Sequence, residues 1–171
     1  MNIEHIDISK FKRESTFYGE LDLLLTIKNF DLESIRQRYI KSKKNVSGRA
    51  GSIERREVGN GGLATLRLGG SQILNCEVLA QLKEPRGIDR KEGILAFSSE
   101  NKVFLVSEKE SKEISDSWFS YIHTVDISSD GTKILISSSG FDCIFEYDLL
   151  SGEKSSEWFA WENGINKGVD P

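Results

Sequence analysis

The sequence is poor in the residues that build disulfide frameworks and transition-metal sites. Its 171 residues include two cysteines, two histidines, two prolines and one methionine. Two cysteines are too few for a framework of disulfides, and no two of these potential metal ligands stand close together in the sequence. We therefore predict no metal site and no cofactor. Cys76 and Cys143 each lie in an apolar strand pattern, so we expect both to be small buried thiols.

Long apolar runs are also missing. Residues 1–13 mix charged and apolar side chains without the apolar run of a signal peptide, and no later stretch approaches the roughly 20 apolar residues of a membrane span. We therefore expect a cytoplasmic protein with no membrane partner. The formal net charge of −4, from 23 basic and 27 acidic residues, argues against a broad nucleic-acid surface.

One local stretch departs from this acidic balance. Between residues 41 and 56 the chain is basic, and we interpret this stretch as a solvated linker, with a weak contact to an anion or a nucleic acid as the alternative. Its basic residues are Lys41, Lys43, Lys44, Arg49, Arg55 and Arg56.

The chain does contain a segment that occurs twice. Residues 86–106 and 123–147 share a pattern of short apolar strands separated by turns, and Leu95 matches Leu135, 40 positions later. A period of roughly 40 residues built from short strands is typical of β-propeller blades. The pattern predicts a first blade over about 85–114 and a second over about 122–161.

Two further features belong to this repeat region. The apolar run 134–136 predicts a strand covered on both faces by neighbouring blades. Residues 63–68 and 72–79 predict a hairpin, which we interpret as the outer half of a preceding blade. Since propellers typically have about 4 to 8 blades, a fragment of a longer protein, a ring closed by association and a small open β structure all stay open.

The region before the repeats follows a different plan. Residues 16–29 predict a strand that places Leu21, Leu23, Leu25 and Ile27 on one side, although Leu21, Leu24 and Leu25 would also share a helix face. Residues 31–40 predict a helix that Asp31 caps, with Leu32, Ile35 and Tyr39 on one face. Residues 42–62 predict a flexible or hairpin-rich connection that ends in a glycine-rich turn, 59–62.

Together these patterns predict a mainly β fold. We expect a partial β-propeller of two to three four-stranded antiparallel blades over residues 61–171. It follows an N-terminal region, 1–60, that contains one helix near 31–41 and a basic, Gly-rich linker.

Both predicted blades resemble known propeller repeats. The first is similar to NHL-type blades through its Pro-x-Gly-Ile opening at 85–88 and its strands at 93–97 and 101–105. The second more closely resembles arylsulfotransferase-like repeats through His123, Asp130-Gly131, the strands 134–139 and 144–148, Gly152-Glu153 and Trp158. Both resemble the propeller superfamily that includes NHL-type and quinoprotein-like repeats. The resemblance covers about 75 residues of the 171, and such turn motifs specify blades rather than an activity.

The arylsulfotransferase-like resemblance implies a role for His123. In that family a histidine accepts the sulfuryl group, so the resemblance implies His123 as a catalytic nucleophile activated by a nearby base. The alternative is a histidine that stabilises its blade by hydrogen bonding. Turns and strand ends explain the carboxylates of the repeats, including Asp130 and Asp148, and calcium in a channel stays an alternative for them.

Two aromatic clusters stand one repeat apart. The first contains Trp118 and Tyr121, and the second contains Trp158 and Trp161. Equivalent places in successive blades favour packing between blades. The alternative is an exposed surface for a protein or small-molecule ligand, because tryptophan and tyrosine contribute strongly to interfaces.

These observations support three hypotheses of function. The leading hypothesis is a binding or scaffold module that displays loops to a protein or a small ligand, as a fragment of a longer propeller protein. The second is a fragment of an arylsulfotransferase-like or quinoprotein-like enzyme with His123 as its best candidate residue. The third is a structural unit that self-associates.

Overall fold

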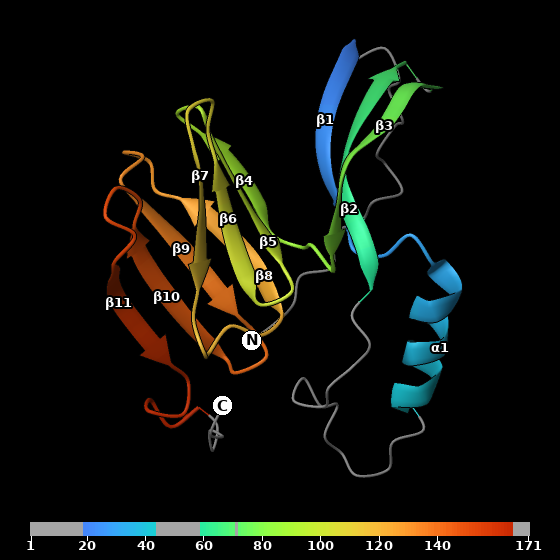
Figure 1. The fold of residues 1–171 in the computed structure, drawn as a ribbon. Helices are drawn as coiled ribbons and strands as arrows, with labels where there is room; N and C mark the ends of the chain where they lie inside the picture. The colour runs from blue at the N-terminus through green and yellow to red at the C-terminus, as the bar shows by residue number, and fades with distance from the viewer. Residues whose placement is uncertain (1–18, 44–58, 71, 166–171) are drawn as a thin grey trace, which may run out of the picture.

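A computed structural model describes residues 19–43, 59–70 and 72–165, which form three antiparallel sheets and one helix (Figure 1). The N-terminal sheet has the strand order β1-β2-β3, the first blade β4-β5-β6-β7 and the second blade β8-β9-β10-β11. The expected mainly β fold class is therefore confirmed, with two sheets of four strands and one of three. The elements are β1 Glu20–Ile27, α1 Leu32–Lys43, β2 Asn60–Gly69, β3 Gln72–Lys83, β4 Ile88–Lys91, β5 Ile94–Ser99, β6 Lys102–Val106, β7 Ser111–Ser115, β8 Ile122–Ile127, β9 Lys133–Ser138, β10 Cys143–Asp148 and β11 Lys154–Phe159.

Aspartates hold the turns of the second blade. The Asp130 carboxylate accepts hydrogen bonds from Ser128 Oγ at 2.6 Å and from Thr132 N at 3.1 Å, and these bonds lower the pKa of Asp130 to about 2. Asp148 accepts in the same way from the backbone N–H groups that follow it, between β10 and β11. The expected turn role of both carboxylates is confirmed.

The two blades repeat a pair of serine hydrogen bonds. Ser98 Oγ accepts a hydrogen bond from Gly87 N at 3.0 Å, and Ser137 Oγ accepts one from Thr124 N at 3.1 Å. The next residue of each strand also bonds to the backbone before the blade: the hydroxyl of Ser99 donates to Lys83 O, and that of Ser138 donates to Ser120 O, both at 2.9 Å. Residue 98 therefore corresponds to residue 137.

This correspondence corrects the expected match of Leu95 with Leu135, because Leu95 corresponds instead to Ile134. A single offset of 40 fits neither strand, because equivalent residues lie 39 positions apart before the turn and 41 positions apart after it. Residues 100 and 101 join β5 to β6, whereas residues 139–142 join β9 to β10. A shift of one residue moves a side chain to the opposite face of a sheet, so the corrected register decides which positions of the two blades are equivalent.

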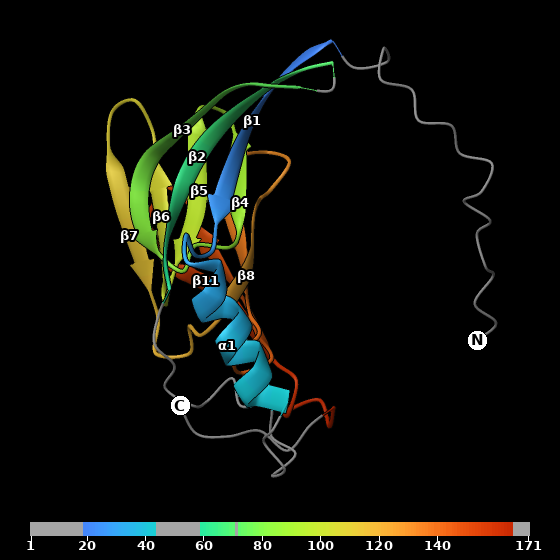
Figure 2. The same cartoon turned by 90° about the vertical axis from the view of Figure 1, so that its right-hand side faces the viewer.

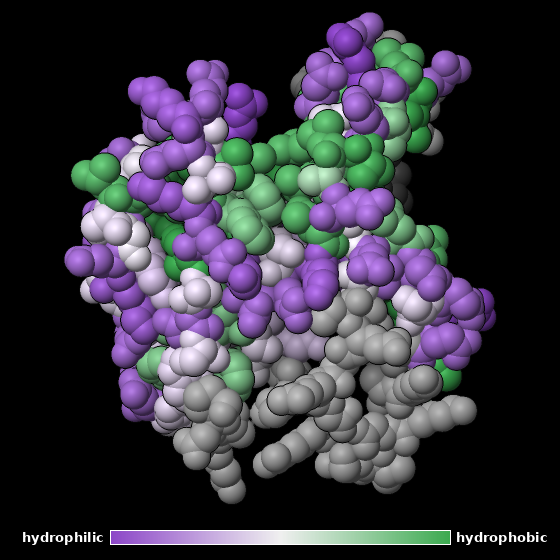
Figure 3. Space-filling view, viewed as in Figure 1, coloured by the Kyte–Doolittle hydropathy of each residue, from purple (hydrophilic) through white to green (hydrophobic). Residues whose placement is uncertain are grey.

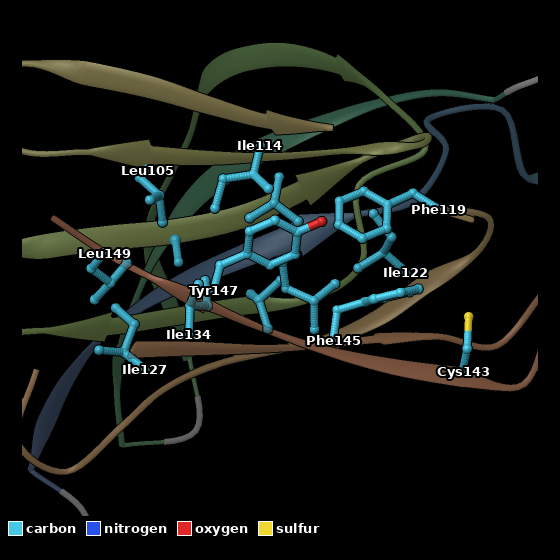
Figure 4. Close-up of a cluster of buried hydrophobic side chains, with 14 of the residues drawn as sticks. Leu105, Ile114, Phe119, Ile122, Ile127, Ile134, Cys143, Phe145, Tyr147 and Leu149 are labelled. Atoms are coloured by element: carbon cyan, nitrogen blue, oxygen red, sulfur yellow. The ribbon is translucent and has the colours of Figure 1, made fainter. Parts of the chain in front are cut away.

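The first blade packs face to face on the second, with β8 against β4 and β5. Glycine permits this approach, because a Cβ atom at Gly87 would lie 2.8 Å from Val125 N. The apolar side chains between the blades form one core (Figure 4). Fully burying one such side chain contributes roughly 1.5–3 kcal/mol. The core residues are Ala96, Val103, Leu105, Ile114, Phe119, Ile122, Val125, Ile127, Ile134, Ile136, Cys143, Phe145, Tyr147, Leu149 and Phe159.

The N-terminal sheet lies beside the first blade (Figure 2) and is attached to it at Glu84. The buried Glu84 carboxylate pairs with Lys28 Nζ at 3.2 Å and with Arg86 Nη2 at 2.9 Å. Thr26 Oγ1 donates a hydrogen bond to Arg86 O at 2.6 Å. Polar contacts from the end of β1 therefore meet the start of the blades at one point.

Gly61 and Gly62 lie at the start of strand β2 and do not form the expected turn. A Cβ atom at Gly61 would collide with the carbonyl oxygen of Ile27, and one at Gly62 with that of Ala80. The glycines are therefore needed where three strands approach closely, and the prediction of a turn at these residues is wrong. β1, which precedes residue 60, pairs along its whole length with β2.

Helix α1 begins as its sequence predicts. Asp31 Oδ1 accepts a hydrogen bond from Ser34 N at 3.1 Å, which confirms Asp31 as its cap. The expected apolar face is only partly realised, since Leu32 is exposed and Ile35 half-buried. No helix in the described ranges is long and apolar enough to cross a membrane. Of the basic stretch, residues 44–56 lie outside the described residues, as does most of the predicted connection.

Two expectations about burial are wrong. Cys76 is exposed on β3, because β3 is the edge strand of a three-stranded sheet, whereas Cys143 is buried as expected. The run 134–136 is covered on one face only, since Ile134 and Ile136 are 0% exposed and Leu135 is 43% exposed. Within the described part of the chain, nothing covers the second face of β9.

Candidate functional site

His123 lies near the start of β8, with an exposed side chain that contacts Arg86. The distance from His123 Nε2 to Arg86 Nη1 is 3.0 Å. A guanidinium group can only donate hydrogen bonds, so Nε2 must accept and the ring proton must lie on Nδ1. The structure therefore gives His123 a defined tautomer.

The surroundings of His123 favour its neutral form. Partial desolvation of the ring lowers the pKa of His123 below the usual 6.5, and the positive charges of Arg86 and Lys28 lower it further. A neutral imidazole is the form that a nucleophile needs. However, Arg86 engages the Nε2 lone pair and cannot act as a base, so this geometry suits a stabilising hydrogen bond better than sulfuryl transfer.

Arg86 is itself held from several directions. Its guanidinium bonds to Glu84 and lies 4.9 Å from the ring centroid of Tyr121. The backbone of Tyr121 adopts a φ of 51°, which is uncommon for a bulky residue. The Tyr121 ring therefore packs against the Arg86 guanidinium at the junction between the N-terminal sheet and the blades. Arg86 was not predicted as a site residue, because nothing in the sequence distinguishes it beyond its place in the repeat.

The three tryptophans occupy different surroundings. The Trp118 ring lies 5.2 Å from that of Trp161 and 5.1 Å from that of Phe159, and both tryptophans pack against the core. Trp158 lies in β11 and is 38% exposed. Trp118 follows β7 and Trp158 lies within a strand, so the expected equivalence of these two residues is wrong.

The corrected register shows what Trp158 corresponds to. Val103 pairs with Ile114 in the first blade, and Ile144 pairs with Trp158 in the second. Val103 corresponds to Ile144, because each lies opposite the equivalent serine, Ser98 or Ser137. Trp158 therefore corresponds to Ile114.

These equivalent positions differ in burial. Ala96, Val103 and Ile114 lie on the face of the first blade that packs against the second, and they are 0 to 6% exposed. Their counterparts Leu135, Ile144 and Trp158 are 37 to 43% exposed. We call these three residues the open face of the second blade. It is the face that a further blade would cover.

The open face carries a shallow hollow of about 400 Å³. Ile144, Trp158 and Ile165 line it together with polar groups from Ser137 and Asp142. An apolar floor with a few polar groups at its margin suits contact with a protein surface. The sequence marked Trp158 as a candidate for such a surface but did not mark Leu135 or Ile144.

The Cys143 thiol and the potential metal ligands provide no further candidate site among the described residues. Burial raises the pKa of the Cys143 thiol to about 11, so this thiol is protonated and unreactive at neutral pH. Across the described ranges, no three histidine, cysteine, aspartate or glutamate side chains gather so as to hold a metal ion.

Comparison with known proteins gives only remote likeness, to solved structures. No protein family matches the sequence, and no curated protein matches it. Among solved structures, the chain is similar to a chain of the crystal structure of a nidogen/laminin complex, with 16% sequence identity and a TM-score of 0.45. The likeness covers 60% of this chain and 41% of that chain. At this TM-score it carries no argument, and the assignment of blades rests on the sheets and their register.

Proposed function

We propose that this chain is a protein-binding module that uses the open face of the second blade. The partner presents the apolar face of a β-sheet, as the second blade presents one to the first. The observation that carries the proposal is the contrast in burial between equivalent positions. Ala96, Val103 and Ile114 are buried by a neighbouring sheet, and Leu135, Ile144 and Trp158 are exposed.

The chemistry of the open face supports a sheet as partner. Two sheets pack about 10 Å apart through interdigitated apolar side chains. Ile144 lies directly opposite Trp158 on the neighbouring strand, and Leu135 lies on β9 opposite Glu146, so the open face holds an apolar pair on β10 and β11 and a further leucine on β9. Polar side chains border it, among them Lys133 and Glu146, which form an ion pair at 2.6 Å. An apolar centre with a polar border is the usual arrangement of a protein interface.

The test is photo-crosslinking in the native host. We replace Trp158 by the photoreactive residue benzoylphenylalanine and, as a matched control, Leu150, which is 87% exposed in the β10–β11 turn. We expect a discrete crosslinked protein from position 158 and none from position 150. In the same experiment Ile144→Asp should reduce the yield about 10-fold or more, as for a central interface residue.

Either of two results would overturn the proposal. One is a crosslinking pattern that is the same at positions 158 and 150. The other is a discrete product at position 158 that Ile144→Asp leaves unchanged while circular dichroism shows an intact fold. The second result would place the contact outside the open face.

A further inference from the structure

Strand β3 is an unusually apolar edge. Within the described ranges, no strand pairs with its outer edge. Four of its apolar side chains, Ile73, Leu74, Val78 and Leu79, are 49 to 66% exposed. A long apolar edge strand with unpaired N–H and C=O groups is a template for pairing with another strand, and hydrophobic surface is visible where β2 and β3 lie (Figure 3).

The exposed side chains lie on both faces of β3. Ile73 pairs with Leu68 and so shares its face. Leu74 lies on the other face, since its side chain occupies the space beside Gly69. A partner that covered one face of the sheet would leave the other set exposed. A strand added at the edge contacts both sets, so the edge rather than a face is the uncovered surface.

Two irregularities give β3 an internal symmetry. Its pairing with β2 skips Leu74 near one end and Leu79 near the other, as β-bulges. The regular positions between them are residues 75 to 78, and Cys76 lies near their middle. When the two bulged residues are left out of the count, Ile73 and Val78 are equally distant from Cys76 along the strand and lie on the same face as Cys76. Asn75 and Glu77 are its direct neighbours on either side and lie on the opposite face.

We propose that β3 pairs antiparallel with β3 of a second copy of this chain, with the two-fold axis at Cys76. This arrangement joins two N-terminal sheets into one sheet of six strands. It places Ile73 of one copy opposite Val78 of the other on one face, and Asn75 opposite Glu77 on the other face. A two-fold interface makes each of these pairs twice.

The charged residues of β3 favour this register, and they favour a second copy of the chain as the strand that pairs with the edge. Glu77 and Lys83 are the only charged residues of β3. An axis at Glu77 would set two carboxylates opposite each other, which is unfavourable. An axis at Cys76 sets each carboxylate opposite a neutral amide that can donate a hydrogen bond. The strand is thus compatible in charge with its own copy. This inference does not rest on the proposed function, since the open face of the second blade takes no part.

The first test uses opposite charges at Asn75, which is exposed. Asn75→Glu sets an added carboxylate opposite Glu77 twice in the dimer, and Asn75→Lys sets an ammonium group there as the matched control. We expect sedimentation equilibrium to show a dimer for the native chain. At roughly 0.2–1 kcal/mol for each pair, Asn75→Glu should weaken it about 2- to 30-fold, and Asn75→Lys should not weaken it.

The second test uses Cys76 as a reporter of the axis. Diamide oxidises two thiols to a disulfide and takes up the two electrons and two protons. We expect a covalent dimer from the native chain and none from Cys76→Ser, which keeps the buried Cys143. Three results would each overturn the proposal: a monomer at every concentration, a dimer insensitive to Asn75→Glu, or slow exchange, in a monomer, of the β3 amides that point away from β2. The last would show that another segment of the same chain covers the edge.

Discussion

Buried hydroxyl groups join each blade to the backbone that precedes it, and single residues should therefore show this contribution. Ser98 is 1% exposed and accepts the hydrogen bond of Gly87 N. Ser98→Ala leaves this N–H group buried without an acceptor, so we expect a loss of about 1–3 kcal/mol in the free energy of unfolding. Urea denaturation followed by circular dichroism measures it.

The control for Ser98 is a serine with an exposed hydrogen bond. Ser155 donates to the Glu146 carboxylate at 2.7 Å and is exposed. Ser155→Ala should change the free energy of unfolding by less than about 0.5 kcal/mol. Equal effects of the two substitutions would contradict the role assigned to Ser98.

A second residue, Asp116, should make stability depend on pH. Burial acts to raise the pKa of this carboxyl group, but hydrogen bonds from Trp118 N, Lys154 Nζ and the Tyr147 hydroxyl outweigh burial and hold the pKa below 3.8. A lowered pKa in the folded state means that the unfolded state binds the proton more readily. The stabilisation is therefore fully present above about pH 4 and is lost as the pH falls through the folded pKa.

Asp116→Asn tests this linkage. At neutral pH we expect the variant to be less stable by about 1–2 kcal/mol, because it loses charged hydrogen bonds. The difference between native chain and variant should shrink as the pH falls from about 5 to about 2. Urea titrations at each pH provide the measurement, and a difference that stays constant over this range would rule out Asp116 as its source.

At the scale of elements, local signals predicted more than long-range ones. The helix cap at Asp31 and the turn at Asp130 were predictable, because their hydrogen bonds join residues at most three positions apart. The match of Leu95 with Leu135 failed, because equivalent residues lie 39 positions apart before the β5–β6 and β9–β10 turns and 41 positions apart after them, so a single offset of 40 fits neither strand. The spacing of strands therefore predicts that a blade is present, but it does not predict which side chains lie on which face of its sheet.

The candidate sites depend on contacts that no single segment contains. Arg86 and His123 meet because β4 and β8 are neighbouring inner strands of two blades. Leu135 differs from Ile134 in burial only because one face of the second blade has a neighbour and the other has none among the described residues. Side-chain type alone could not indicate this difference.

At the scale of the whole molecule, Glu84 controls how the N-terminal sheet is attached to the blades. Its side chain is 9% exposed and pairs with Lys28 from the end of β1 and with Arg86 from the start of the blades. Removing one partner of a buried ion pair leaves the other charges uncompensated. Since Glu84 N also donates to Gly59 O at 2.8 Å, the residue joins three segments that are distant in sequence.

Glu84→Gln keeps the size of the side chain and removes its charge. We expect a loss of about 1–3 kcal/mol in stability and, more specifically, faster amide hydrogen exchange in β1 and β2 than in β8 and β9. The matched control is Glu110→Gln, which breaks an exposed pair with Lys112 at 3.2 Å and should cost less than about 1 kcal/mol. Faster exchange spread evenly over all three sheets would show that Glu84 stabilises the fold as a whole. Faster exchange confined to the N-terminal sheet would show that this sheet opens separately from the blades, because its attachment is polar whereas the blades share an apolar core.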